Sequence, residues 1–393
     1  MTDLLSAGGA LLDDAVDLRR RLHRHPELGL VLPETQTAIL EALDGLPLTV
    51  TTGTATTSVV ATLEGDREGP TILLRGDMDA LPMPEDTGLD YASEVDGAMH
   101  ACGHDTHVAM LAGAARLLTE RRGDIAGRVL FMFQPGEEGH GGAKVMLDEG
   151  LLGSGPDRPT AAFAIHQTPN MPSGLVAAKG GAQLASADTL EITVTAQGGH
   201  ASMPHLACDP IPVACEIATA IHTMITRTVD AFDPAVVTIA KIRAGTTSNV
   251  IPETAYMLGT IRCVSERTRH RVHDHLRRLA DGIAAAHGAT AEVTIGADGY
   301  PVTVNDDAWA DTALAVAAST LGQDKALRMP TPVMGAEDFS YVLNEVPGAM
   351  VFLGTAVGPG HQAPNHSNRM VLDEAAMASG IALYAAMALH HCR

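Results

Sequence analysis

The order of apolar and polar residues along the chain predicts helices and strands that alternate. Apolar residues recur with helical spacing in segments 11–25, 106–121 and 143–149. Short apolar or β-branched runs predict strands at residues 58–63, 71–74, 127–134 and 161–165. This alternation favours a layered α/β fold, in which functional side chains gather at the carboxyl ends of the strands.

The pattern changes near residue 186. Strand-like runs and two helical segments then follow in the order β-α-β-β-α-β, at 189–196, 209–227, 235–243, 254–263, 265–287 and 290–295. This is the order of a ferredoxin-like unit. We therefore expect an inserted domain at 186–298. A first domain, residues 1–185 and 299–393, should form an α/β/α layer around a central mixed, mostly parallel sheet.

Composition narrows the class of protein. The 393 residues are 46% hydrophobic and 3% aromatic, so a large core is expected to consist mainly of aliphatic side chains and methionine. The formal charge of -21 opposes binding to nucleic acid or to an anionic membrane. No apolar run approaches the roughly 20 residues that cross a bilayer, and no secretory signal is visible. The five cysteines are scattered and odd in number, which favours a reducing cytoplasm over a disulfide framework.

The richest chemistry lies in residues 99–107, MHACGHDTH. Cys102 and His104 are two residues apart, and thiolate and imidazole donors both suit zinc or a similar transition metal. The alternative for the segment is a helix start that is merely rich in histidine, with Cys102 as a small buried apolar residue.

Acidic and histidine side chains stand at the predicted strand ends. Asp77 and Asp79 follow one strand, and Glu137 and Glu138 follow another between glycines. His166 ends a third. Adjacent side chains on an extended segment diverge, so one glutamate is available to a metal while its neighbour faces a bound water. Solvated acidic loops remain the alternative for both pairs.

Two other hydrolase classes lack their motifs here. No serine has glycine both two residues before and two after it, so the usual nucleophile elbow is absent. The HExxH motif of helix-borne zinc proteases is also absent.

The chain resembles the M20-type metallopeptidases, specifically the amidohydrolase branch with hippurate hydrolases and indole-acetyl-amino-acid hydrolases. The resemblance covers nearly the whole length and rests on ordered motifs: RRRLHRHPELG, LRGDMDALPMPEDTG, MHACGHDTH, FQPGEEG, AIH, GGHAS, TTSNVIPE, MGAEDFSY and PNHSN. It implies two bound divalent ions, with zinc, manganese, cobalt or nickel as candidates. Such ions activate water near neutral pH and polarise a carbonyl.

The resemblance also implies roles for single residues. The implied metal ligands are Cys102, His104, Glu138, His166 and His366. Cys102 stands where other branches carry a metal-bridging aspartate. Glu137 would be the general base, and Asp79 would orient a ligand.

Three residues of the inserted domain match residues that contact the substrate: His200, Asn249 and Arg262. His200 would stabilise the oxyanion, and Arg262 would grip the carboxylate of the amino acid. The inserted domain would then act as a lid and dimerisation domain, in a homodimer or higher homo-oligomer. Gln167 departs from the family pattern, because many relatives carry an aromatic residue there, and we interpret it as a change in the acyl pocket.

The implied reaction is the hydrolysis of a small-molecule N-acyl-amino acid to a carboxylic acid and a free amino acid. An aminopeptidase or dipeptidase of the same clan, and a non-catalytic metal-binding relative, are the alternatives. The non-catalytic alternative predicts the loss of Glu137 or of ligands, and all of them are present.

Overall fold

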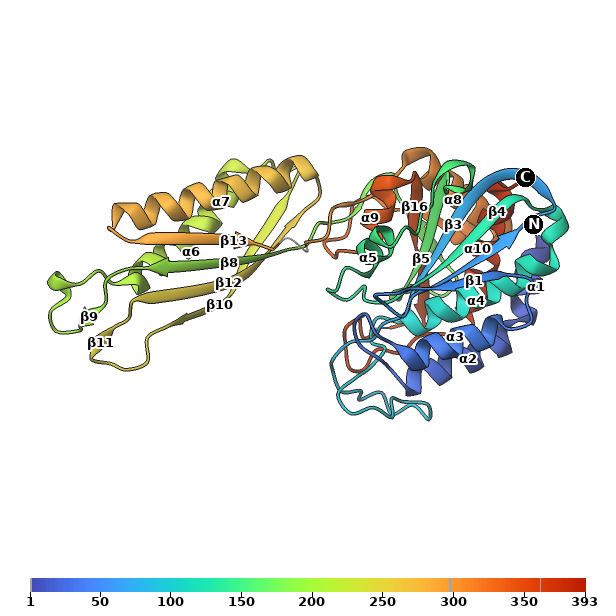
Figure 1. Ribbon diagram of the computed structural model, residues 1–393, viewed down its shortest axis with the longest axis horizontal. Coiled ribbons are helices and arrows are strands. Elements are labelled where there is room, and N and C mark those ends of the chain that lie inside the picture. Colours follow the sequence, from blue (N-terminus) through green and yellow to red (C-terminus); the bar gives the residue numbers. More distant parts are fainter. Residues whose placement is uncertain (1, 297–298, 361) are drawn as a thin grey trace. The chain divides into compact units, whose positions relative to one another are not determined.

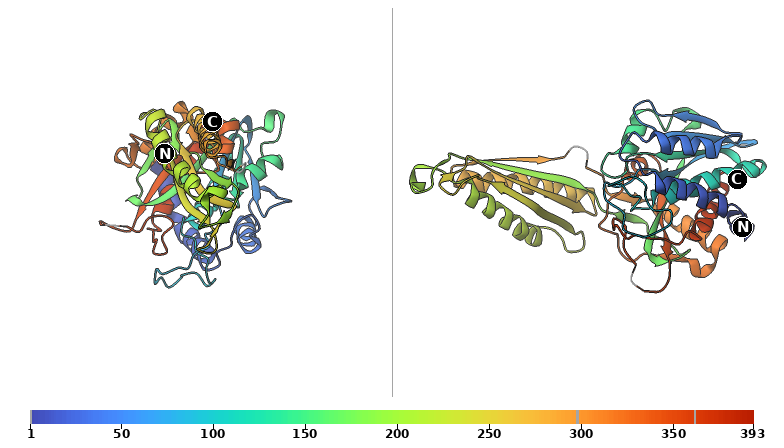
Figure 2. Two further views of the ribbon diagram at one scale, coloured as in Figure 1. Left: turned by 90° about the vertical axis from the view of Figure 1, so that its left-hand side faces the viewer. Right: turned by 90° about the horizontal axis from the view of Figure 1, so that it is seen from below.

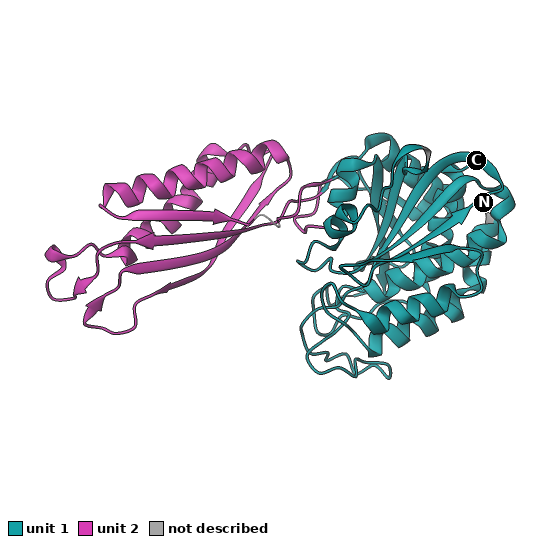
Figure 3. Cartoon of the chain, in the orientation of Figure 1, with its two compact units in different colours: residues 1–183, 304–331, 338–393 teal, residues 184–303, 332–337 magenta. Residues whose placement is uncertain are grey.

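The protein is described by a computed structural model that covers residues 2–296, 299–360 and 362–393. It divides into two compact units, shown in Figure 3. Unit 1 comprises Met1–Gln183, Val304–Thr331 and Asp338–Arg393, and unit 2 comprises Leu184–Thr303 and Pro332–Glu337. The domain boundary expected after residue 298 falls outside the described residues.

Unit 1 is built on a mixed sheet, which has eight strands within the described ranges, in the order β1-β2-β4-β3-β5-β16-β6-β15 (Figure 1). The strands are β1 (Thr49–Thr52), β2 (Val59–Glu64), β3 (Arg67–Asp77), β4 (Ala126–Gln134), β5 (Ala161–Pro172), β6 (Val176–Ala178), β15 (Ala326–Arg328) and β16 (Gly348–Ala356). The central strands β4, β3, β5 and β16 run parallel, whereas β1, β2 and β6 add antiparallel pairings. The predicted fold class is confirmed.

Helices bury the sheet of unit 1. They are α1 (Thr2–Ala10), α2 (Leu12–Arg24), α3 (Pro33–Leu43), α4 (His104–Glu120), α5 (Gly142–Asp148), α8 (Asp307–Leu321), α9 (Ser340–Glu345) and α10 (Ala376–His391). The two Ala-rich helices α4 and α10 pack on each other and on β3. Every residue of β3 from Thr71 to Asp77 is buried, as expected for a strand covered on both faces. The strand ends that carry acidic groups are therefore fixed by a large aliphatic core.

Unit 2 has the predicted β-α-β-β-α-β order. Its elements are β8 (Asp188–Thr195), α6 (Pro210–Thr228), β10 (Ala235–Ala244), β12 (Thr254–Cys263), α7 (Glu266–Ala286) and β13 (Thr290–Ile295). The sheet order is β10-β12-β8-β13 and all pairs are antiparallel. Both helices pack on one face of this sheet (Figure 2). A two-stranded sheet of β9 (Gly199–His200) and β11 (Val250–Ile251) precedes β12. Two further short strands, β7 (Gly181–Leu184) and β14 (Thr303–Asn305), pair with each other.

Two expectations about single elements were wrong. Strand β5 does not end at His166 but continues to Pro172, because its parallel pairing with β16 continues to Thr168. Helix α4 begins at His104, two residues earlier than expected, because Gly103 turns the chain just before it. No helix among the described residues is long and apolar enough to cross a membrane.

Candidate metal centre

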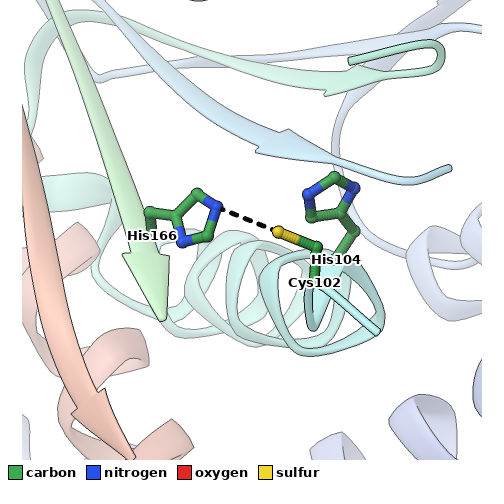
Figure 4. Close-up of side chains that lie close together, drawn as sticks. All are labelled: Cys102, His104 and His166. Atoms are coloured by element: carbon green, nitrogen blue, oxygen red, sulfur yellow. Dashed lines mark hydrogen bonds between the residues drawn. The ribbon is translucent and has the colours of Figure 1, made fainter. Parts of the chain in front are cut away.

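Five side chains from four segments of unit 1 form two overlapping groups of metal-ligand atoms. Cys102, His104 and His166 have such atoms within 4.8 Å of one another, as do Cys102, Glu138 and His366. Cys102 belongs to both groups. Figure 4 shows the first group, in which the Cys102 Sγ lies 3.5 Å from the His166 Nε2. The five ligands named from the sequence are thus brought together.

A left-handed turn at Gly103 places Cys102 and His104 on the same site. The Gly103 φ of +78° is a conformation that side chains other than glycine rarely adopt. A Cβ atom there would also lie 2.5 Å from the Nε2 of Gln167. Position 103 therefore requires glycine for two reasons, namely its left-handed backbone conformation and the close approach of Gln167 on β5.

Two histidines are oriented by carbonyl groups. His104 Nδ1 donates to the Asp79 carbonyl at 2.9 Å, and His166 Nδ1 donates to the Gln167 carbonyl at 2.6 Å. Because a carbonyl only accepts, each ring carries its proton on Nδ1 and leaves Nε2 as a metal donor. His104 Nε2 is buried and has no hydrogen-bond partner among the described residues.

The two glutamates are held by Asp79. Its Oδ1 accepts the backbone N–H of Glu137 and its Oδ2 accepts that of Glu138, both at 3.0 Å. Glu137 is 6% exposed and lies beside His104 and Glu138. Glu138 Oε1 is buried and forms an ion pair with His366 Nε2 at 3.2 Å. Asp79 thus supports both acids through its carboxylate and His104 through its carbonyl.

His366 has an unusual backbone. Its φ of 66° makes it the one non-glycine residue with positive φ in the described part of the chain. Its N–H donates to the Ala101 carbonyl at 2.8 Å. Such strained positions persist where the surrounding structure fixes them, and they cluster at functional sites.

The electrostatics of the cluster suit a divalent cation. Burial opposes ionisation of Cys102, but His166 and His104 outweigh it and lower the thiol pKa to about 6. The neighbouring thiol of Cys102 and carboxylate of Glu138 raise the pKa of His366 to about 10. The donor set is one sulfur, three imidazole nitrogens and a carboxylate, with His104 Nε2 and Glu138 Oε1 lacking hydrogen bonds within the described residues. These residues fit a bound transition metal or zinc.

The sequence did not predict the buried histidine–aspartate contacts behind the ligands. His107 Nδ1 donates to Asp77, and its Nε2 accepts the Gln167 N–H at 2.8 Å, so neither nitrogen is left for a metal. His23 Nδ1 lies 2.7 Å from Asp105 Oδ2, although 82 residues separate them. The signals for these residues were the position of Asp77 at a strand end and the histidines in segments 19–25 and 99–107, and neither signal showed which side chains meet.

The three residues expected to contact the substrate lie in unit 2. His200 is exposed, and its Nδ1 accepts the Ser202 N–H at 3.1 Å, so the neutral ring carries its proton on Nε2. The Asn249 carbonyl accepts from Ala201 at 3.1 Å, which places Asn249 next to His200. Arg262 lies near the far end of β12, and burial lowers its pKa.

Comparisons with known proteins place the chain among metallopeptidases. Residues 73–390 match the model of peptidase family M20/M25/M40. The chain is 40% identical to thermostable carboxypeptidase 1 of Saccharolobus solfataricus, over 96% of this chain and 95% of that protein. It is 39% identical to the N-acetylcysteine deacetylase of Bacillus subtilis, over 86% and 88%. It is similar to the crystal structure of a Bacillus subtilis protein described as a dinuclear metal binding peptidase from the M20 family. The TM-score is 0.83 at 35% identity, covering 97% of this chain and 99% of that one.

Proposed function

Because the chain belongs to peptidase family M20/M25/M40, whose members hydrolyse amide bonds, we propose that it cleaves N-acyl-amino acids to a carboxylic acid and a free amino acid. The observation that carries the proposal is the pair of donor groups that share Cys102, with Glu137 beside them. This arrangement supports a centre for two divalent ions, held by Cys102, His104, His166, Glu138 and His366. When bound, the ions polarise the scissile carbonyl and lower the pKa of water.

Glu137 is the general base in this proposal. Asp79 anchors its backbone, and its side chain is nearly buried next to the ligand groups. A carboxylate in this position takes a proton from the attacking water and returns it to the leaving amine, because an amide nitrogen leaves only once it is protonated. Glu138 remains a ligand, with its carboxylate within 4.8 Å of ligand atoms of His104 and Glu137.

His200 donates a hydrogen bond to the developing oxyanion. The tautomer set by Ser202 leaves an Nε2–H group on an exposed ring. A donor aimed at the position where negative charge develops lowers the barrier of amide hydrolysis. Asn249 immediately precedes β11 of the same small two-stranded sheet and contacts the same substrate group in this proposal.

Arg262 binds the carboxylate of the amino acid. Within the described residues its half-buried guanidinium makes no hydrogen bond, so its donors are available to a bidentate carboxylate. The names of the relatives support this role, because a carboxypeptidase substrate and N-acetylcysteine both carry a carboxylate on the amine side of the scissile amide.

The distance along β12 supports a site shared between two copies of the chain. Asn249 and His200 lie next to the start of β12, whereas Arg262 is its penultimate residue. From Thr254 to Arg262 the strand advances eight residues, which is about 26 Å. One copy of unit 2 therefore cannot bring His200 and Arg262 to one small substrate. We propose a homodimer in which His200 acts at the partner's metal centre, with unit 2 as lid and dimerisation domain.

The test is a substrate panel. N-acetyl- and N-benzoyl-amino acids are assayed beside their carboxamides and beside dipeptides with a free amine. The proposal expects turnover of the N-acyl-amino acids and loss of kcat/KM for the carboxamides. Glu137→Gln should lower kcat by at least about 10²-fold while the ions stay bound. A preference for dipeptides would favour the aminopeptidase or dipeptidase alternative, and near-normal turnover by Glu137→Gln would refute the general base.

A further inference from the structure

Gln167 connects three of the segments that carry the candidate ligands. It follows His166 on β5, and its side chain is 0% exposed. Its Nε2 donates to the Cys102 carbonyl at 2.7 Å and to the Asn365 Oδ1 at 2.9 Å. Asn365 immediately precedes His366. One carboxamide thus joins the segments of Cys102, His166 and His366.

The orientation of this carboxamide is unambiguous. The Cys102 carbonyl only accepts, so the atom facing it must be the amide nitrogen. On the other side, Thr355 Oγ1 donates to the Gln167 Oε1 at 2.8 Å. Both amide hydrogens and the amide oxygen are used, so rotation of the side chain would leave several buried groups without partners.

The backbone of Gln167 makes further contacts, among them a hydrogen bond from Asn365 Nδ2 to its carbonyl at 3.4 Å. Its N–H donates to His107 Nε2 at 2.8 Å, and its carbonyl accepts from His166 Nδ1 at 2.6 Å. The side chain also lies so close to Gly103 that a Cβ atom there would clash. The buried side chain is therefore unavailable to an acyl group, contrary to the interpretation that this residue shapes the acyl pocket.

We propose that Gln167 is a positioning residue that holds Cys102, His166 and His366 at the separation needed to bind the two ions. This inference rests on the proposed function, because it assumes that these residues are the ligands. Asp79 supports the other part of the centre, through Glu137, Glu138 and the His104 ring. Gln167 therefore supports the segments of Cys102, His166 and His366, and Asp79 supports Glu138 and His104.

The test measures metal affinity rather than activity. Full-length metal-free protein is titrated with Zn²⁺ and separately with Mn²⁺ against a chromophoric chelator, and bound metal is counted by mass spectrometry. Gln167→Glu removes the amide donors at constant size, and Gln167→Met removes all polar atoms without adding a charge. Both should bind metal about 10–100-fold more weakly, as is typical when a group supporting a ligand is lost. Thr355→Val, which removes one hydrogen bond, should weaken binding in the same direction by a smaller factor.

Gln183→Met is the matched control. Gln183 is also a fully buried glutamine of unit 1, but its side chain contacts the Lys179 N–H and the Met329 sulfur instead of a ligand segment. It should keep wild-type metal affinity even if it lowers stability. Wild-type affinity in both Gln167→Met and Thr355→Val would overturn the proposal, as would an equal loss in Gln183→Met.

A further variant separates this inference from the proposed function. Cys102→Ala should lose metal if the ligand assignment is right. If Cys102→Ala loses metal while the Gln167 variants do not, only the positioning role fails. If Cys102→Ala keeps both ions at full affinity, the ligand assignment fails and the positioning role fails with it.

Discussion

Removing the Asp79 carboxylate should uncouple both glutamates from the metal centre. Asp79 is 1% exposed and accepts the backbone N–H groups of Glu137 and Glu138, each at 3.0 Å. Hydrogen bonds to a charged group contribute about 1.5–3 kcal/mol each. Asp79→Ala loses two of them and should lower the free energy of unfolding by about 3–6 kcal/mol. Asp79→Asn keeps one acceptor oxygen, so its loss should be about half as large.

The same change should lower turnover more than substrate binding. Asp79 fixes the backbone of Glu137, and a displacement of a catalytic group by about 1 Å costs on the order of 10²-fold in rate. We therefore expect kcat of Asp79→Asn to fall about 100-fold, with a much smaller change in KM. Urea unfolding of the metal-free protein and steady-state kinetics of the reloaded protein measure the two effects separately.

Asp233→Asn provides the control for this experiment. Asp233 accepts from Ser265, Thr268 and Arg267 in unit 2 and contacts none of the candidate ligands. It should lower stability without lowering kcat. If Asp79→Asn unfolds like the wild type and keeps its kcat, Asp79 does not organise the acids.

Three other predictions concern single side chains. Burial opposes the charge of His23, but Asp105 outweighs burial and raises the His23 pKa. The contact between His23 and Asp105 therefore stabilises the fold fully below about pH 6.5, and this stabilisation is lost as the pH rises through the folded-state pKa of His23. His23→Gln should flatten the pH dependence of urea unfolding above about pH 6.5. Gly103→Ala should lower the free energy of unfolding by more than about 1–2 kcal/mol, because the new methyl group meets both a left-handed backbone and a clash against Gln167. The same variant should bind zinc more weakly in a chelator competition. Arg262→Lys should raise KM for N-acyl-amino acids with little change in kcat, because a lysine lacks the bidentate fork; an unchanged KM would exclude carboxylate binding by this residue.

Local patterns predicted most of the elements that carry the site. Apolar runs at 71–74 and 127–134 located β3 and β4, which lead to Asp79 and Glu137, and the helical segment at 265–287 located α7. The short spacing of Cys102 and His104 also indicated a metal site, because both donors lie in one turn of the chain. Period and spacing are visible in sequence because they arise from neighbouring residues.

Contacts between distant segments were not predictable in this way. The pairing of His23 with Asp105 spans 82 residues, and that of Gln167 with Asn365 spans 198. Such pairs depend on the order of the strands in the sheet and on which loops lie side by side. They produce no periodic pattern of residues along the sequence. The side chain of Gln167 was misread for this reason: its position after His166 suggested a pocket, whereas its partners come from segments far away.

In the proposed mechanism, amide hydrolysis requires two divalent ions held around Cys102. The most direct measurement removes all metal from the wild-type chain, adds back one divalent cation stepwise, and records bound ions per chain together with turnover of an N-acyl-amino acid. We predict no turnover without metal, and full turnover only as the second ion is bound. Full turnover by a chain that carries no ion would show that the reaction does not depend on these ions.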